Sequence, residues 1–476
     1  MSHSRFIPRI AVLALCASMA ACVSDAHRQP SVAVPTGFSD HKMAATAGEE
    51  ALDAWWLLFN DEQLTALVNQ ALGNAPDART AIAVLQQAQA TRATAMNRFS
   101  LQGAATGSRQ DQQNNTQGVP GYHQTTYTGA FSPSWELGLF GREDAMRRAA
   151  NADLDAARFQ YEASRQSLAS SVAGDLIEAR ANAIRLQQAR ETLRVAQELA
   201  RVGDRRAALG LASPADAASL TADVATARAN VRAIAVRLEI ARRTLLVLLG
   251  RGTEPIEVIP IAAELTSAPA IPAATPASLL VRRPDIRQAE ARLRSAAGTL
   301  TLNARELLPT VSLSASGSFT KLIGPAGYAT ALWSLGEGLA LPVLNRPRLL
   351  AQVRGQRART EQAVIAYENA VQSGFAEAQN ALTTYAGDQA RLKDLAQAEE
   401  RARFAFSAQA EGYRRGVVDL SALLQAERTW RANLASLSDL RAGTLTDSVN
   451  LFRALGGGWP ASQQAGTNTA KNEKDS

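Results

Sequence analysis

Histidine and cysteine serve most often in metal binding and nucleophilic catalysis, and this chain has four of the first and two of the second. His27, His41 and His123 and one cysteine, Cys22, follow an N-terminal apolar run. A zinc site needs several such ligands together, and a catalytic triad needs a histidine in the folded body. No Gly-x-x-x-x-Gly-Lys-[Ser/Thr] phosphate loop is present. The sequence therefore predicts no catalytic residue, no metal site, no cofactor and no enzyme.

Cys22 is the residue with the clearest chemistry. Arg5 and Arg9 precede the apolar run from Ile10 to Ala21, which is too short for a membrane-spanning helix of about 20 residues. This pattern predicts a signal peptide over residues 1–21. Ordinary cleavage of such a signal peptide would leave Cys22 unmodified.

The stretch Met19-Ala-Ala-Cys22 resembles the lipobox of bacterial lipoproteins, with Met in place of the usual Leu. That resemblance implies, as the alternative to an unmodified cysteine, acylation of Cys22, for example with palmitate. Because Val23 stands where an Asp would retain the protein in the inner membrane, it also implies sorting to the outer membrane. We interpret residues 22–50, which carry Pro, Ser, Thr and Gly without helical periodicity, as a lipidated linker.

Charge and composition indicate long, thin helical layers. Apolar residues make up 46% of the chain but aromatic residues only 5%, so alanine supplies much of the apolar share. Fifty basic residues oppose 44 acidic ones, a net charge of +6. Both signs are interspersed along helical stretches, which indicates solvated faces. Nucleic acid or anionic lipid is the alternative partner for the basic residues, and we expect no nucleic acid.

The chain contains one pattern twice. Pro76-Asp77-x-Arg79 recurs as Pro284-Asp285-x-Arg287 at an offset of 208 residues. Gly210 recurs as Gly416 at an offset of 206 residues. Agreement between these offsets predicts a tandem duplication, with repeat 1 over residues 51–270 and repeat 2 over residues 271–458. We expect the tail, residues 459–476, to be disordered.

Each repeat is expected to contain a long helical hairpin, over residues 141–250 and 348–455. Apolar residues in these ranges recur at steps of three, four and seven, which is typical of amphipathic helices. Glycines at 203–210 and 412–416 are expected to supply the turns. Because a two-helix hairpin cannot bury both of its flanks, the hairpins must pack laterally into a larger assembly.

Four segments alternate between apolar and polar residues and predict strands, at 99–109, 123–137, 309–320 and 331–343. This alternation fits a transmembrane barrel wall with its apolar face outward. The alternative is a pair of soluble hairpins over a hydrophobic surface. In a barrel wall, the loops 109–122 and 321–330, which are rich in Gly, Asn, Gln and Pro, would lie at the outward-facing ends of the hairpins. The aromatic residues expected at the membrane interface, or else simply in barrel packing, are Tyr127, Phe131, Trp135, Phe319 and Trp333.

Four strands cannot close a barrel, and an open edge in lipid leaves backbone groups unpaired at several kcal/mol each. More than one chain is therefore required. Two copies supply eight strands and three supply twelve, and the pattern itself does not choose between them.

Three motifs together resemble one family. They are Trp55-Trp56-x-x-Phe59-x-Asp61, Ser134-Trp-Glu-Leu-Gly-Leu-Phe-Gly-Arg142 and Arg282-Arg-Pro-Asp-Ile-Arg-Gln-Ala-Glu-Ala-Arg-Leu293. They are similar to motifs of the TolC-like outer membrane efflux proteins, in the NodT/OprM-like lipoprotein branch of resistance-nodulation-division systems. Gly138 replaces the family's Asp in the second motif. The resemblance covers residues 50 to 458.

The resemblance implies a mainly helical homotrimer. Its twelve-strand transmembrane β-barrel, with four strands per chain, would continue into a long periplasmic α-helical barrel. It implies a passive exit duct in the outer membrane for small molecules, with a periplasmic adaptor protein and an inner-membrane pump as partners. The alternative is a periplasmic coiled-coil scaffold or adaptor lipoprotein, which would lack the alternating strands.

In this family the resting duct is constricted at the periplasmic helical tips by acidic and apolar rings. The resemblance therefore makes the tip residues gate candidates: Gly210, Asp216, Gly416, Asp419 and Gln425. Many relatives carry Asp at the position of Gln425, so this chain departs from the pattern there. The alternative for Asp216 and Asp419 is an ordinary acidic residue in the first turn of a helix. Arg205 and Arg206 bind an adaptor, pair with these aspartates, or are simply solvated.

Overall fold

The computed structural model describes residues 26–35, 37–38, 52–115, 117, 121–271 and 276–459. The predicted signal peptide, Cys22, most of the linker and nearly all of the tail lie outside the described residues. The chain forms two compact units, and each takes segments from both repeats. Unit 1 comprises Met1–Ser31, Leu85–Arg158 and Gln288–Asn369, and unit 2 comprises Val32–Val84, Phe159–Arg287 and Ala370–Ser476.

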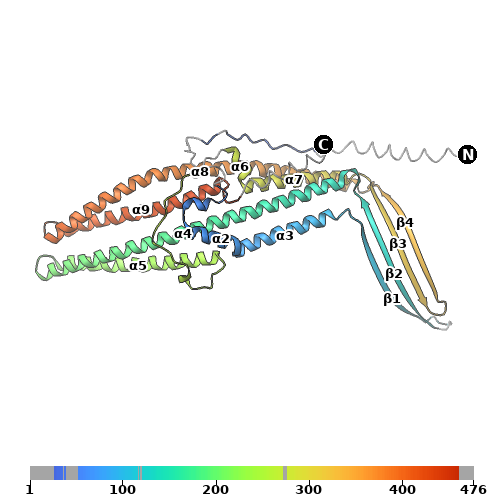
Figure 1. Ribbon diagram of the computed structural model, residues 1–476, viewed down its shortest axis with the longest axis horizontal. Helices are drawn as coiled ribbons and strands as arrows, with labels where there is room; N and C mark the ends of the chain where they lie inside the picture. The colour runs from blue at the N-terminus through green and yellow to red at the C-terminus, as the bar shows by residue number, and fades with distance from the viewer. Residues whose placement is uncertain are drawn as a thin grey trace. The chain divides into compact units, whose positions relative to one another are not determined.

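The order of elements is the same in the two halves of the chain (Figure 1). Repeat 1 runs α2 (Glu62–Asn74), α3 (Pro76–Met96), β1 (Gln102–Asn114), β2 (Tyr122–Leu137), α4 (Arg142–Ala208) and α5 (Pro214–Leu248). Repeat 2 runs α6 (Pro276–Arg282), α7 (Pro284–Arg305), β3 (Thr310–Ile323), β4 (Tyr328–Ala340), α8 (Arg346–Arg415) and α9 (Leu420–Ala454). The long helices have 67 and 70 residues, and the returning helices have 35 each. The predicted tandem duplication is therefore confirmed.

Unit 1 contains one antiparallel sheet in the order β1-β2-β3-β4. Its strands are in direct register, and one row of opposite residues is Ala105, Phe131, Gly317 and Trp333. Since opposite residues share a face, odd-numbered residues of all four strands form one face and even-numbered residues form the other. Serines dominate the even face of β3, where the Ser316 and Ser334 hydroxyls lie 2.8 Å apart. The predicted polar face is present, and the predicted apolar face is present with charged interruptions: Arg109, Asp111 and Lys321 toward the turn ends, and Glu337 on β4.

The strands extend further than the sequence predicts at the turn ends. The predicted boundary at residue 109 is wrong, because β1 continues to Asn114, and β3 continues to Ile323 rather than 320. The connections are accordingly shorter than the predicted loops 109–122 and 321–330. Polar residues stay in the sheet because they pair across it: Thr125 donates to Asp111 at 2.6 Å, and Gln124 donates to Gln112 at 3.2 Å.

The second sequence motif forms the sharp link from β2 to α4. Phe140 and Gly141 both have positive φ, 58° and 72°. Glu136 and Arg142 form an ion pair of 3.0 Å across the link. A Cβ added at Gly138 would lie 2.7 Å from the Cβ of Glu143, so this turn leaves little room for the family's aspartate.

The first motif is core structure in unit 2. Trp55, in the 3-10 helix η2 (Trp55–Phe59), is fully buried and stacks on Phe452 of α9 with ring centroids 5.7 Å apart. Asp61 caps α2 by accepting from the Leu64 amide at 3.0 Å, and its carboxylate also pairs with the buried Arg180 of α4. These contacts fix the start of the chain's helical body onto α4 and α9.

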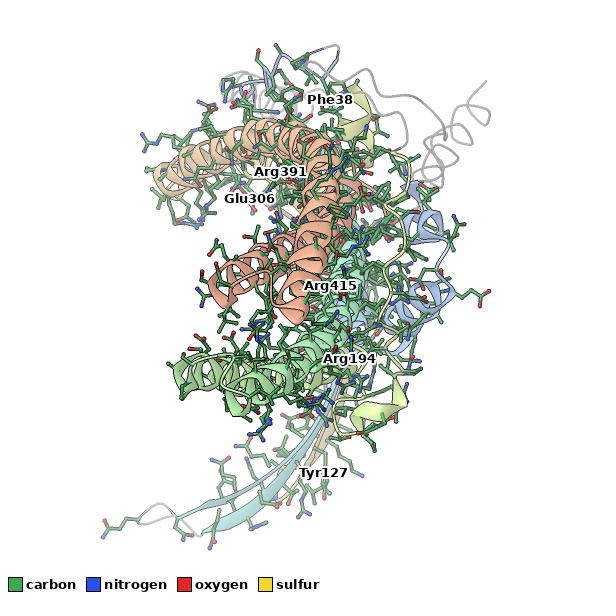
Figure 2. The ribbon with its side chains drawn as sticks, turned by 90° about the vertical axis from the view of Figure 1, so that its left-hand side faces the viewer. Phe38, Tyr127, Arg194, Glu306, Arg391 and Arg415 are labelled. Atoms are coloured by element: carbon green, nitrogen blue, oxygen red, sulfur yellow. The ribbon has the colours of Figure 1, made fainter. Side chains whose placement is uncertain are left out.

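The helical hairpins place α5 beside α4 and α9 beside α8 (Figure 1), and Figure 2 looks at their ends. The predicted turn at Gly203–Gly210 begins too early, because α4 continues through Gly203 to Ala208. The predicted turn at Gly412–Gly416 also begins too early, because α8 continues through Gly412 to Arg415. A Cβ at Gly203 would lie 2.5 Å from the Leu220 side chain, and one at Gly412 would lie 2.5 Å from Val418. These two glycines permit close packing rather than a turn.

Within the part of the chain that the structure describes, no helix is both long and apolar enough to cross a membrane.

Candidate functional site at the helical tips

The two tip turns have the same backbone. Gly210 and Gly416 have φ of 70° and 80°, a conformation that side chains with a Cβ rarely adopt. The Gly210 amide donates to Ala207 and the Leu211 amide to Arg206, at 3.0 and 2.8 Å. Gly416 and Val417 repeat this pair of bonds. Both long helices therefore end in Schellman motifs, which close the last turn and reverse the chain.

The helices that follow begin with matched caps. Ser213 caps α5, and Asp216 completes a capping box with it. Asp419, 206 positions after Ser213, caps α9 by accepting from the Ala422 amide at 2.7 Å. The hydrogen bond from the Ala422 amide lowers the pKa of Asp419 below its ordinary value, and the hydrogen bond from the Ser421 hydroxyl lowers it further. Both aspartates thus stabilise helix starts, and Asp419 stays ionised at neutral pH.

The tips also contain a contact that the sequence did not reveal. Arg206 of α4 donates to the main-chain carbonyl of Tyr413 of α8 at 2.6 Å, and its guanidinium lies 4.6 Å from the centre of the Tyr413 ring. Arg206 therefore pairs with neither predicted aspartate. Its neighbour Arg205 is exposed. The sequence did contain a signal for this contact. One predicted long helix has a cation in its last turn, and the other has an aromatic residue there.

Below this contact the two hairpins share a small apolar core. Its buried members include Leu199 of α4, Leu220 of α5, Phe406 and Tyr413 of α8, and Leu423 of α9. Phe406 stacks on Trp430 with centroids 5.0 Å apart, and the Trp430 indole donates to Glu399 at 3.1 Å. Arg206 closes the tip end of this core, so its loss would loosen one hairpin from the other.

The turns themselves expose apolar and polar side chains. Leu209, Leu211 and Val417 are 73%, 65% and 79% exposed. Gln425 is exposed on α9 beyond the cap. Large exposed apolar side chains at two adjoining turns are typical of a surface that another protein covers.

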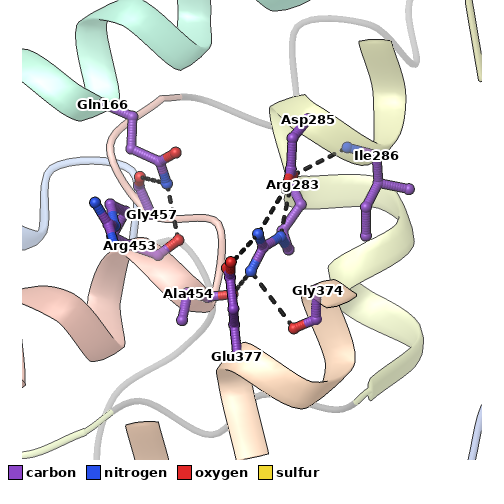
Figure 3. A network of polar contacts seen from close by, with 9 residues as sticks. All are labelled: Gln166, Arg283, Asp285, Ile286, Gly374, Glu377, Arg453, Ala454 and Gly457. Carbon is purple, nitrogen blue, oxygen red and sulfur yellow. Dashed lines mark hydrogen bonds and ion pairs between the residues drawn. The ribbon is translucent and has the colours of Figure 1, made fainter. Parts of the chain in front are cut away.

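At the opposite end of the α8–α9 hairpin, Arg283 joins three helices (Figure 3). This buried guanidinium donates to Asp285 at 2.7 Å, to Glu377 of α8 at 2.7 Å and to the carbonyl of Ala454 of α9 at 3.1 Å. Burial disfavours the charge, but the hydrogen bonds that the guanidinium donates to Asp285 and Glu377 outweigh it and raise the pKa of Arg283. This explains part of the third sequence motif as structure, not as chemistry on a substrate.

The predicted interface aromatics all lie on the odd-numbered face of the sheet and are exposed. Their exposed fractions run from 39% at Tyr127 to 81% at Trp333, with Trp135, Phe319 and Phe131 at 41%, 51% and 57%. The Trp135 indole also donates to the carbonyl of Phe99 at 2.8 Å. Their place at a membrane interface stays a prediction.

No group of three or more His, Cys, Asp and Glu side chains that could hold a metal occurs among the described residues. The structure contains a sheet with one mainly apolar and one polar face, and it contains paired helical hairpins.

Comparison with known proteins identifies the family of the chain. The family model described as "Outer membrane efflux protein" matches residues 67–251 and 275–457. The chain belongs to this family, and the predicted resemblance is confirmed.

The relatives match over nearly their full length. The pyoverdine export outer membrane protein OpmQ of Pseudomonas aeruginosa is 28% identical over 96% of this chain and 98% of its own. The cation efflux system protein CusC of Escherichia coli K12 is 26% identical over 96% and 100%.

Among solved structures, the outer-membrane channel OprN superposes with a TM-score of 0.79 at 26% identity, covering 92% of this chain and all of that one. The open state of the MtrE channel of Neisseria gonorrhoeae gives 0.77 at 24% identity, covering 92% and 99%. The chain thus has the predicted fold class, that of the outer membrane efflux channels. The names of these relatives describe transport rather than an enzyme activity. The scaffold alternative, which would lack alternating strands, does not fit the sheet.

Proposed function

We propose that three copies of this chain form a passive exit duct through the outer membrane. The observation that carries the proposal is the four-stranded sheet, with an apolar face, a polar face and no partner for β1 or β4 among the described residues. Twelve strands from three copies would close a barrel wide enough for a lumen. The apolar face would meet lipid and the serine-rich face would line the passage.

The helical hairpins would extend the duct into the periplasm and end at the tips. There the exposed Leu209, Leu211 and Val417 would dock a periplasmic adaptor, which connects the duct to an inner-membrane pump. Energy comes from the pump, so the duct needs no nucleotide site.

A passive duct must be closed at rest. The Arg206–Tyr413 contact holds the two hairpins of one chain together, and it would keep the tips closed until an adaptor separates them. The turn and cap residues Gly210, Asp216, Gly416, Asp419 and Gln425 would form the constriction, with Asp419 supplying a ring of negative charge.

Relatives are named for pyoverdine export and for cation efflux. The duct would accordingly carry small molecules that its pump selects. Acylation at Cys22 would add an anchor in the outer membrane beside the barrel.

Fractionation and single-channel recording test the proposal. The chain should sediment with outer membranes, run as a detergent-stable trimer and conduct ions in planar bilayers. A dissolved monomer without conductance would overturn it. Globomycin should make the precursor accumulate, as it should not for Cys22→Ser. If globomycin makes the precursor accumulate in neither protein, the predicted lipid anchor is wrong. The duct is then tested by its conductance alone.

A further inference from the structure

The Arg283 network of repeat 2 (Figure 3) has a counterpart in repeat 1 that lacks the arginine. The short helices α3 and α7 are related by an offset of 208 residues, and the long and returning helices by an offset of 206 residues. The main chain agrees with this alignment, because Gly250 and Gly456 follow α5 and α9 with φ of 74° and 78°. Ala75, which is buried between α2 and α3, is the counterpart of Arg283.

The groups that surround the Arg283 guanidinium keep their places in repeat 1. In repeat 2 this guanidinium donates to two carboxylates and to two main-chain carbonyls, those of Asp285, Glu377, Gly374 and Ala454. Their counterparts in repeat 1 are, in the same order, Asp77, Ser171, Leu168 and Leu248. All four counterparts line one cleft of about 630 Å³ between α3, α4 and the end of α5. This cleft therefore lies where repeat 2 holds a guanidinium.

A change in packing explains why this cleft stays open. In repeat 2 a Cβ added at Gly374 would lie 3.0 Å from the Arg283 Nε and 3.1 Å from the Ile286 Cδ1. Repeat 1 has Leu168 in place of this glycine and Ala78 in place of this isoleucine, and both are buried. The leucine thus compensates for the missing isoleucine side chain. The alanine that replaces the arginine leaves the space of the guanidinium unfilled.

The cleft contains acceptors that have no donor. The Asp77 carboxylate forms no hydrogen bond or ion pair among the described residues. Its counterpart Asp285 binds Arg283 through both oxygens, at 3.0 and 2.7 Å. Leu248 is the last residue of α5, and its carbonyl accepts no main-chain hydrogen bond within the described ranges. Because the C-terminus of a helix favours positive charge, carboxylate and carbonyl together attract a cation.

We propose that this cleft binds a guanidinium group, either of a small molecule or of an arginine in a neighbouring copy. The planar fork of N–H donors in a guanidinium fits a carboxylate beside two carbonyl oxygens, as it does in repeat 2, whereas an ammonium lacks this fork. Ser171 replaces the second carboxylate of repeat 2, so Asp77 supplies one negative charge for one positive charge. All of these residues lie in unit 2, and the site does not depend on the duct.

Binding of agmatine to the purified full-length protein tests the proposal. Agmatine carries a guanidinium where the diamine putrescine, on the same carbon chain, carries an ammonium. Agmatine should raise the unfolding temperature in a saturable way, and putrescine should bind roughly tenfold more weakly. Asp77→Asn should weaken agmatine binding by about tenfold or more, since a hydrogen bond to a charged group is lost. Glu62→Gln changes an exposed acid in the first turn of α2, outside the cleft, and should leave binding unchanged.

The other repeat supplies a filled version of the cleft. A variant that copies repeat 2 at four positions carries Ala75→Arg, Ala78→Ile, Leu168→Gly and Ser171→Glu. It should no longer bind agmatine, because its own guanidinium occupies the cleft. If this variant does not fold, Asp77→Asn still decides.

The outcomes separate the two sources of the guanidinium. Saturable agmatine binding that Asp77→Asn weakens identifies a small molecule, whether or not the chain forms a duct. If agmatine does not bind and Asp77→Asn lowers the yield of trimer, the guanidinium is an arginine of a neighbouring copy. Equal binding of agmatine and putrescine overturns the proposal, as does an Asp77→Asn variant with unchanged agmatine binding and unchanged trimer.

Discussion

At the scale of single residues, Arg206 decides how the two hairpins are joined. Its planar guanidinium makes two contacts at once, one with the Tyr413 carbonyl and one with the Tyr413 ring. A lysine keeps the charge but not this geometry. We expect Arg206→Lys to destabilise the tip by about 1–2 kcal/mol and to increase single-channel conductance of the resting trimer.

The matched control is Arg205→Lys, since Arg205 is the exposed neighbour of the same type. It should leave both conductance and thermal unfolding unchanged. Equal conductance in the two lysine variants would mean that the Arg206 contact does not close the duct.

Asp419 gives a residue-scale prediction that depends on pH. Its folded-state pKa is lowered chiefly by the Ala422 amide, so its stabilising effect is present above the ordinary aspartate pKa of about 3.9 and is lost as pH falls through the folded value. Asp419→Ala should therefore lower thermal stability at neutral pH, and this deficit should shrink in acid.

The other repeat supplies the comparison for this effect. Ser213→Ala removes the equivalent cap, at a cost of about 1 kcal/mol, but takes away no titrating group. Its stability deficit should persist in acid. An acid-independent deficit for Asp419→Ala would show that its charge does not matter.

At the scale of elements, the sequence predicted what local chemistry determines. Repeats, helix starts and alternating faces follow from spacing, and the structure has each of them. It did not predict that α4 continues through Gly203, because the space that this glycine provides is filled by Leu220 from another helix. The partner of Arg206 was missed for the same reason, since Tyr413 lies 207 residues away.

Glycines within and after α8 should respond oppositely to alanine. Gly416→Ala places a Cβ at a φ of 80° and should destabilise the hairpin by about 1–2 kcal/mol. Gly387 lies inside α8 with open space around it, so Gly387→Ala should stabilise the helix by about 1 kcal/mol. Thermal unfolding measures both, and a shift of the same sign would contradict the assigned turn.

At the scale of the whole molecule, the two faces of the sheet must meet different surroundings. Ala130 and Phe131 are adjacent on the central strand β2, and they point to opposite faces: Ala130 lies opposite Ser318, and Phe131 opposite Gly317. They share the same depth along the strand. Only the direction of the side chain distinguishes them.

Replacing each of these two residues by arginine distinguishes a side chain that faces lipid from one that faces water. On a lipid-facing position it costs up to about 2–4 kcal/mol, depending on its depth in the bilayer, so Phe131→Arg should reduce the yield of detergent-stable trimer in outer membranes. Ala130→Arg would add charge to a watery lumen, so that variant should assemble normally and shift the ion selectivity of the channel. Loss of assembly in Ala130→Arg alone would reverse the assignment of the two faces. Equal assembly of both variants would remove that assignment, on which the duct depends.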